Sequence, residues 1–245
     1  MAVTFVANGS AVNTTTTTLT LVAPTLVGGD TLIAVIVTHD NTAISGQDAR
    51  WQTVYAANNT AAQRFTIFAM QALVGDSGAS FNFTVAGTTA ALGRLTAYRG
   101  ARAVGTSSSS ANASSATVTW ATMTPNQKDS VILAAAGIGI QTGSNGGISA
   151  GTPTFTNEYY SAGTTDAIAL YDALTPAGSA TGARTMNNTQ AAVNTGVFFE
   201  LIPIPPTTGS GGSGGSSNSR SRGTAGNRGA GFPRYRVKDA PRQTR

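Results

Sequence analysis

The feature that most constrains this chain is a succession of about thirteen short segments in which apolar and polar residues alternate, or which form brief apolar runs. Clusters of Gly, Asn, Ser and Pro separate them. Alternation with a period of two is typical of strands with one buried face, and such clusters are typical of turns. The segments are VTFVA (3–7), LTLV (19–22), TLIAVIVT (31–38), WQTVYAA (51–57), RFTIFAMQAL (64–73), SFNFTV (80–85), ALGRLTAY (91–98), ATVTW (116–120), SVILAAAGI (130–138), TFTNEYY (154–160), DAIALYDAL (166–174), ARTM (183–186) and VNTGVFFELI (193–202).

Composition favours the same fold class. Charged residues make up only 10% of the 245 residues, while Thr, Ser, Ala, Gly and Asn dominate. This composition is typical of short strands joined by many turns, and it offers no convincing helix. Because sandwiches and barrels often reach roughly 200 residues as single units, the length fits one large all-β domain with an appendage.

The second series of segments resembles the first. GGDTLIAVIV is similar to QKDSVILAAAG, which aligns Asp30 with Asp129, and RWQTVYAA is similar to TFTNEYYSA. Ala-Leu and Ala-Ala pairs recur with the same separation of 18 residues in both series. We therefore predict an internal duplication, with pseudo-repeats at about 1–104 and 105–204 and a joint around 103–114.

Two equivalent half-sets of strands would most simply pack face to face as the sheets of one sandwich over residues 1–204. Two tandem small sandwiches of about 100 residues each are the alternative. The fold class expected is therefore all-β.

The charge is divided unevenly along the chain. Residues 1–208 carry seven basic and nine acidic side chains, a net charge of −2, whereas residues 209–245 carry eight basic side chains and Asp239, a net charge of +7. Pro-rich and then Gly/Ser-rich residues 205–231 predict a tether, because they hold too few apolar side chains to fold alone. Residues 232–245 mix aromatic side chains with arginines, which predicts a basic docking peptide. The predicted partner-binding residues of this arm are Arg220, Arg222, Arg228, Phe232, Arg234, Tyr235, Arg236, Lys238, Arg242 and Arg245.

The sequence contains no cysteine, so neither disulfides nor thiolate metal sites are expected. The first residues lack the pattern of a secretory signal, and no apolar run reaches the roughly 18 residues that span a bilayer. We expect no membrane partner.

No group of residues predicts catalysis, a cofactor or a metal site. His39 is the only histidine, and with Asp40 and Asn41 it is interpreted as a turn at the end of a strand. Glu158, Asp166 and Asp172 are interpreted as lying on solvated strand faces, and Asp30 and Asp129 as occupying matching turns. A sugar- or base-stacking platform is the alternative to core packing for six aromatic residues, Trp51, Tyr55, Trp120, Tyr159, Tyr160 and Tyr171.

The succession GGDTLIAVIV, RWQTVYAA, RFTIFAMQAL, LTAYRGAR, DSVILAAAG, ARTM and VFFELIP resembles a β-sandwich module of bacteriophage virion proteins and bacterial surface proteins. The likeness covers residues 1–204. It implies a jelly-roll-like sandwich in a head or tail component, and it brings no catalytic residues with it.

The expected function is therefore structural and not enzymatic, located in the virion. We expect a capsid decoration or cement protein that is held by its C-terminal arm to the major capsid protein or another virion protein, and that forms homo-oligomers. A receptor- or carbohydrate-binding module of a tail or fibre is the first alternative. A coat protein whose basic arm binds nucleic acid is the second.

Overall fold

The computed structural model describes residues 2–87, 89–139, 147–175 and 179–205. Contacts divide the chain into one unit of Met1–Pro206 and another of Thr207–Arg245, and the second lies outside the described residues. The strands are β1 (Thr4–Asn8), β2 (Val12–Thr14), β3 (Thr18–Val22), β4 (Thr31–His39), β5 (Ile44–Gly46), β6 (Gln52–Asn59), β7 (Gln63–Gln71), β8 (Ser80–Val85), β9 (Ala91–Arg99), β10 (Ala101–Trp120), β11 (Val131–Ile138), β12 (Thr156–Ala162), β13 (Ala167–Leu174) and β14 (Arg184–Pro203).

All strand pairs are antiparallel, and no described residue is helical, which confirms the predicted all-β class. It follows that the described part of the chain has no helix that could span a membrane. The strands β2 and β5 are additional to the predicted set, and both are only three residues long.

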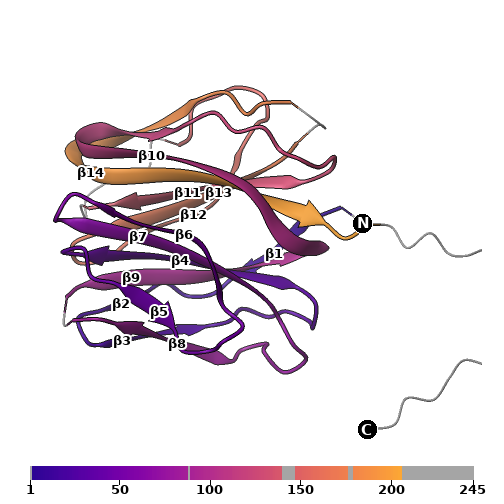
Figure 1. Ribbon diagram of the computed structural model, residues 1–245, viewed down its shortest axis with the longest axis horizontal. Coiled ribbons are helices and arrows are strands. Elements are labelled where there is room, and N and C mark those ends of the chain that lie inside the picture. The colour runs from indigo at the N-terminus through magenta and orange to yellow at the C-terminus, as the bar shows by residue number, and fades with distance from the viewer. Residues whose placement is uncertain (1, 88, 140–146, 176–178, 206–245) are drawn as a thin grey trace, which may run out of the picture. The chain divides into compact units, whose positions relative to one another are not determined.

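The strands form three sheets that are stacked in layers (Figure 1). The largest has the order β1-β9-β4-β7-β6, with β2 also paired to β9. The second has the order β10-β14-β11-β13-β12, and the third is the small sheet β3-β8-β5. The first and third sheets come from the first half of the domain, and the second sheet comes from the second half.

The two large sheets have corresponding strand orders. Strands β1, β9, β4, β7 and β6 correspond in position to β10, β14, β11, β13 and β12. Both edge strands β6 and β12 carry a register shift at the same place, between Thr53 and Tyr55 and between Asn157 and Tyr159. The similar sequence segments of the two halves therefore lie on equivalent strands.

One pair of aligned residues is offset by one position. Asp30 immediately precedes β4 and is buried, whereas the residue that immediately precedes β11 is Ser130. Asp129 is exposed and has a φ of 61°, so it corresponds to Gly29, which has a φ of 90°. The expected equivalence of Asp30 and Asp129 is wrong, because the left-handed turn residue is glycine in one half and aspartate in the other.

Strands β10 and β14 are 20 residues long and pair with each other from Ala101↔Pro203 to Trp120↔Arg184. The predicted joint at 103–114 is wrong, because this Ser-rich segment lies inside β10. The segments ARTM and VNTGVFFELI, predicted as two strands, both lie in β14. The halves are joined instead at Gly100, whose φ is 81°. Backbone pairing with β14 makes this polar segment a strand without an apolar face.

Register shifts between Asn112 and Thr117 mark a corner in β10. Beyond the corner, the distal ends of β10 and β14 fold over the outer face of their own sheet, so that Thr119 approaches Ser110 with 2.7 Å between the hydroxyl oxygens. A Cβ at Gly196 would meet the backbone of Thr119, so the crossing requires a glycine there. These distal ends cover the second large sheet much as β3, β8 and β5 cover the first.

Three apolar cores result from this layering. Ile33, Val35 and Val37 of β4 face the second large sheet, whereas Leu32, Ala34 and Ile36 face the small sheet. Strand β11 is divided in the same way, with Leu133 in the shared core and residues such as Ile132 in the third core. Strands buried on both faces appear as continuous apolar runs, which is the pattern of TLIAVIVT and SVILAAAGI. Each half of the domain is therefore layered by itself, and the two large sheets pack face to face.

Candidate functional site

The residues predicted to bind a partner lie outside the described residues. This applies to the whole set, Arg220, Arg222, Arg228, Phe232, Arg234, Tyr235, Arg236, Lys238, Arg242 and Arg245. The end of the sandwich from which this segment continues is described as far as Pro205. There the backbone N–H of Ile204 donates to the carbonyl of Gly100 at 2.7 Å, so the chain leaves the domain beside the joint between its halves.

His39 ends β4, and Asp40 and Asn41 follow it with φ of 59° and 58°, which confirms the predicted turn. The imidazole Nε2 lies 3.3 Å from the Asp40 carboxylate. Asp166 of the other half lies near this pair, and burial raises its pKa. Among the described residues, no group of three or more acidic, His or Cys side chains could hold a metal ion.

Four of the six candidate platform aromatics are core residues. Trp51, Trp120, Tyr159 and Tyr171 are all at most 9% exposed, and Tyr55 and Tyr160 are partly buried. The Trp120 indole donates a 2.9 Å hydrogen bond to the carbonyl of Ala135. Core packing is therefore confirmed for the four buried rings.

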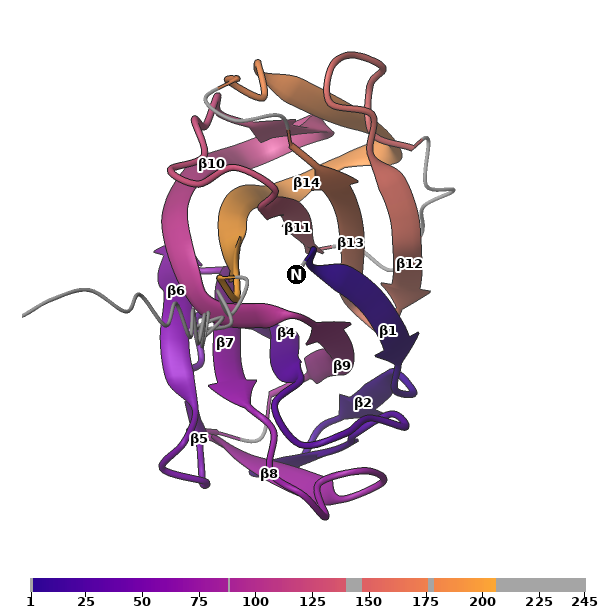
Figure 2. The ribbon, with the colours of Figure 1, turned by 90° about the vertical axis from the view of Figure 1, so that its right-hand side faces the viewer.

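A groove lies between the edge strands of the two large sheets. Figure 2 shows β6 and β10 along one side of the domain and β1 and β12 along the other. The groove between β6 and β10 has a volume of about 750 Å³. Its apolar lining includes the partly buried Val54 and Val104, and the buried Ala69 and Met70. The rest of the lining is Thr31, Arg50, Gln52, Thr53, Gln71, Leu73, Arg102, Ala103 and Gly105.

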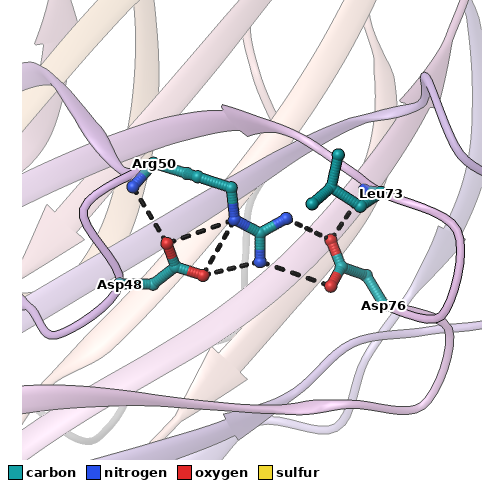
Figure 3. A network of polar contacts seen from close by, with 4 residues as sticks. All are labelled: Asp48, Arg50, Leu73 and Asp76. Atoms are coloured by element: carbon teal, nitrogen blue, oxygen red, sulfur yellow. Dashed lines mark hydrogen bonds and ion pairs between the residues drawn. The ribbon is translucent and has the colours of Figure 1, made fainter.

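At the rim of this groove, Arg50 pairs with both Asp48 and Asp76, and we call these three residues the ionic clamp (Figure 3). The Arg50 guanidinium donates to the Asp48 carboxylate from Nη2 at 2.6 Å and to the Asp76 carboxylate from Nη1 at 2.6 Å. Hydrogen bonds from Arg50 hold the pKa of both carboxyl groups below the usual range. Asp76 also accepts the backbone N–H of Leu73 at 2.7 Å. The clamp thus ties the turn at Leu73–Asp76 to the start of β6.

That turn and the turn at Val27–Asp30 together present an apolar knob, which we define as Val27, Leu73 and Val74. Their exposed fractions are 54%, 57% and 94%. A Cβ at Gly28 would lie 2.9 Å from a Val74 methyl carbon, so the turn rests directly on this glycine. The knob is therefore both exposed and held in place. The sequence placed Leu73 at the end of a predicted strand and gave no signal of its exposure.

Every large hydrophobic side chain that is exposed among the described residues lies toward one end of the sandwich. Besides the knob, these are Phe5, Val22, Leu174 and Ile204. This is the end where β4 and β11 begin and where β7, β9, β13 and β14 finish. A second hollow at this end is lined by Arg102, Lys128, Asp129 and residues 203–205. The chain continues from this same end into the basic segment.

The predicted solvated acids are not all solvated. Asp166 is only 1% exposed, and Glu158 and Asp172 are partly buried on the neighbouring strands β12 and β13. Burial, together with the adjacent Asp172 carboxylate, raises the pKa of Glu158 to about 7. The prediction of a solvated face is wrong for these residues because they lie in or beside the seam between the two large sheets.

We expect the free energy of unfolding to fall as pH rises from about 4.5 to about 7 on account of Glu158. Because the pKa of Glu158 is higher in the folded than in the unfolded protein, only the unfolded state releases the proton across this window. The Glu158→Gln variant should lose this decline and be more stable than the parent at pH 8. Urea unfolding at several pH values measures it, with the exposed Asp129→Asn as control. An unchanged slope would contradict the expected burial of the carboxyl.

Comparison with known proteins finds no matching family model, no matching curated protein and no matching solved structure. The likeness to virion modules therefore stays a prediction that depends on the motifs quoted above.

Proposed function

We propose that this protein is a non-enzymatic structural component of a bacteriophage virion. In this proposal it is a capsid decoration protein, attached by its basic C-terminal arm to the major capsid protein or another virion protein. The observation that carries the proposal is the gathering of exposed apolar side chains toward the end of the sandwich that leads into this arm. A group of exposed apolar side chains at one end of a domain favours an interaction surface there.

The charges support attachment through the same end. Arg102 and Lys128 line the hollow beside Pro205 and make no ion pair among the described residues. The segment that follows carries a net charge of +7, whereas the domain carries −2. A partner surface with acidic and apolar groups would complement both features.

Several acidic side chains of the described domain are engaged in contacts that hold the fold together. Asp30 pairs with Arg99 at 2.9 Å, and Asp48 and Asp76 pair with Arg50. Glu200 is fully buried and accepts hydrogen bonds from the turn before β11. Burial of Trp51 and Trp120 counts against a carbohydrate platform built on these two rings.

The test is co-sedimentation of the protein with DNA-free shells assembled from the major capsid protein of the encoding virus. The full chain and a truncation ending at Thr208 are compared from low to high salt. We expect only the full chain to sediment, and we expect its binding to persist at high salt, because apolar contacts are not screened. Equal sedimentation of both forms would overturn the role of the arm.

A charge-matched control separates protein docking from nucleic-acid binding. Replacing Phe232 and Tyr235 by serine keeps every arginine of the arm, so it should weaken docking on an apolar protein groove. If this variant binds shells like the parent, and binding of the full chain to DNA falls steeply with salt, the arm is a genome-binding segment. That result would replace the decoration role with the coat-protein alternative.

A further inference from the structure

We propose that the groove between β6 and β10, together with the adjoining knob, is an interface between two copies of this chain. The groove and knob form one continuous surface, because Leu73 belongs to both. The interface depends on described residues alone and does not depend on the virion proposal.

The knob is already held in position, so it would lose little conformational entropy on binding a partner. Val74 is 94% exposed, yet its turn is fixed by the Leu73 N–H bond to Asp76 and by the packing of Val74 on Gly28. Asp76 is in turn held by Arg50. An apolar group that is already held in position loses little freedom on binding, so most of the free energy of burying it is retained in the complex.

The arrangement of knob and groove suits a two-fold partner. In an interface with two-fold symmetry, the same patch on each copy must complement itself. A protruding knob at the rim of a groove satisfies this condition, because each knob can enter the groove of the other copy. The apolar floor of Val54, Ala69 and Val104 would then receive Leu73 and Val74 of the second copy.

The charges at this surface also favour a second copy. Asp48 and Asp76 carry two negative charges, and Arg50 and Arg102 carry two positive charges, so the surface is formally neutral. Arg102 makes no ion pair among the described residues, and across a two-fold axis it can pair with an Asp76 or Asp48 carboxylate. A formally neutral surface offers a nucleic acid no net electrostatic attraction.

The second half of the domain lacks an equivalent apolar surface. The register places Glu158 where β6 has Val54, and Asp172 where β7 has Ala69. The corresponding site beside β12 is therefore acidic, although the strands are arranged in the same way. With one such surface per chain, association closes at a dimer and does not continue into a polymer.

The experiment is sedimentation velocity of the purified full chain from about 1 to about 100 μM, a range that brackets dimers of micromolar affinity. Two variants test the two parts of the surface. Val74→Asp changes the knob at a side chain that is 94% exposed, and Thr53→Arg fills the groove from an exposed position on β6. We expect a dimer for the parent chain and, for each variant, association weakened by about 100-fold or more.

Each variant has a matched control in the second half. Leu174→Asp introduces the same charge at another exposed apolar side chain, 59% exposed against 94% for Val74, and Asn157→Arg occupies the register position equivalent to Thr53. Both controls should remain dimeric, and circular dichroism should show all four variants folded. A parent chain that stays monomeric throughout, variants that still dimerise, or controls that dissociate equally would each overturn the proposal. Sedimentation of the purified chain contains no shell protein, so failure here would be distinguishable from failure of the virion role.

Discussion

Glu200→Gln is expected to lower the free energy of unfolding by about 3 kcal/mol, since a hydrogen bond to a charged group is worth about 1.5 to 3 kcal/mol and a buried donor left unpaired costs about 1 to 3 kcal/mol. The Glu200 side chain is fully buried in β14. It accepts the Ser130 hydroxyl at 2.6 Å and the backbone N–H groups of Gln127 at 2.9 Å and Asn126 at 3.1 Å. A glutamine amide has one acceptor oxygen and would present its N–H₂ group to one of these donors.

The ionised state of Glu200 is part of this expectation. Burial alone would raise its pKa, but hydrogen bonds from Ser130 and from three backbone N–H groups hold the pKa below its usual range. The stability that Glu200 contributes is therefore present above its ordinary pKa and is lost as pH falls. The stability difference between parent and Glu200→Gln should accordingly shrink in acid.

Urea unfolding at neutral pH measures this effect. Asp129→Asn is the control, because Asp129 lies in the same turn but is exposed, and asparagine also accepts its φ of 61°. A loss below about 1 kcal/mol for Glu200→Gln would show that the glutamine amide satisfies these donors nearly as well as the carboxylate.

Trp120→Ala is expected to lower the free energy of unfolding by about 4 kcal/mol, because truncating a buried aromatic side chain removes apolar contacts and leaves a cavity. Trp120 is fully buried at the end of β10 and packs against Tyr171 and Phe198, with ring centroids at 6.3 Å and 6.2 Å. Its indole also donates to Ala135 of β11. The residue thus holds the folded-over end of β10 on the outer face of its sheet.

A pair of phenylalanine variants separates the hydrogen bond from the packing. Trp51 is buried in the other half, and its indole N–H has no hydrogen-bond partner among the described residues. Trp120→Phe should therefore cost about 1 kcal/mol more than Trp51→Phe, the net value of one buried hydrogen bond. Equal losses in urea unfolding would indicate that the Ala135 contact contributes nothing.

Part of this fold could be predicted from local pattern, because strand alternation is a property of neighbouring residues. The runs TLIAVIVT and SVILAAAGI became β4 and β11, which are buried on both faces. The Ser-rich segment 103–114 could not be predicted as strand, because its order comes from pairing with residues about 90 positions later. The segments ARTM and VNTGVFFELI were predicted as two strands but form the single strand β14, because both pair with the distant strand β10.

The groove between β6 and β10 and the adjoining knob could not be predicted from the sequence, for a related reason. Arg50, Asp48 and Asp76 can be read as turn residues, and nothing local shows that one arginine joins both carboxylates. Exposure of Leu73 and Val74 depends on which strands end nearby. Their apolar character alone gives no sign of this exposure.

The sequence by itself determined the strand class, the similarity of the two halves and the concentration of positive charge after residue 208, because composition and period are carried by neighbouring residues. Only the tertiary structure decided how the halves combine. In the tertiary structure, particular faces of β4 and β11 meet, and the distal ends of β10 and β14 fold over their own sheet. Val54 lies at one edge of the contact between the two large sheets, and Glu158 lies at the other edge. These outcomes depend on pairing between distant strands, whose register is fixed when both faces are buried together.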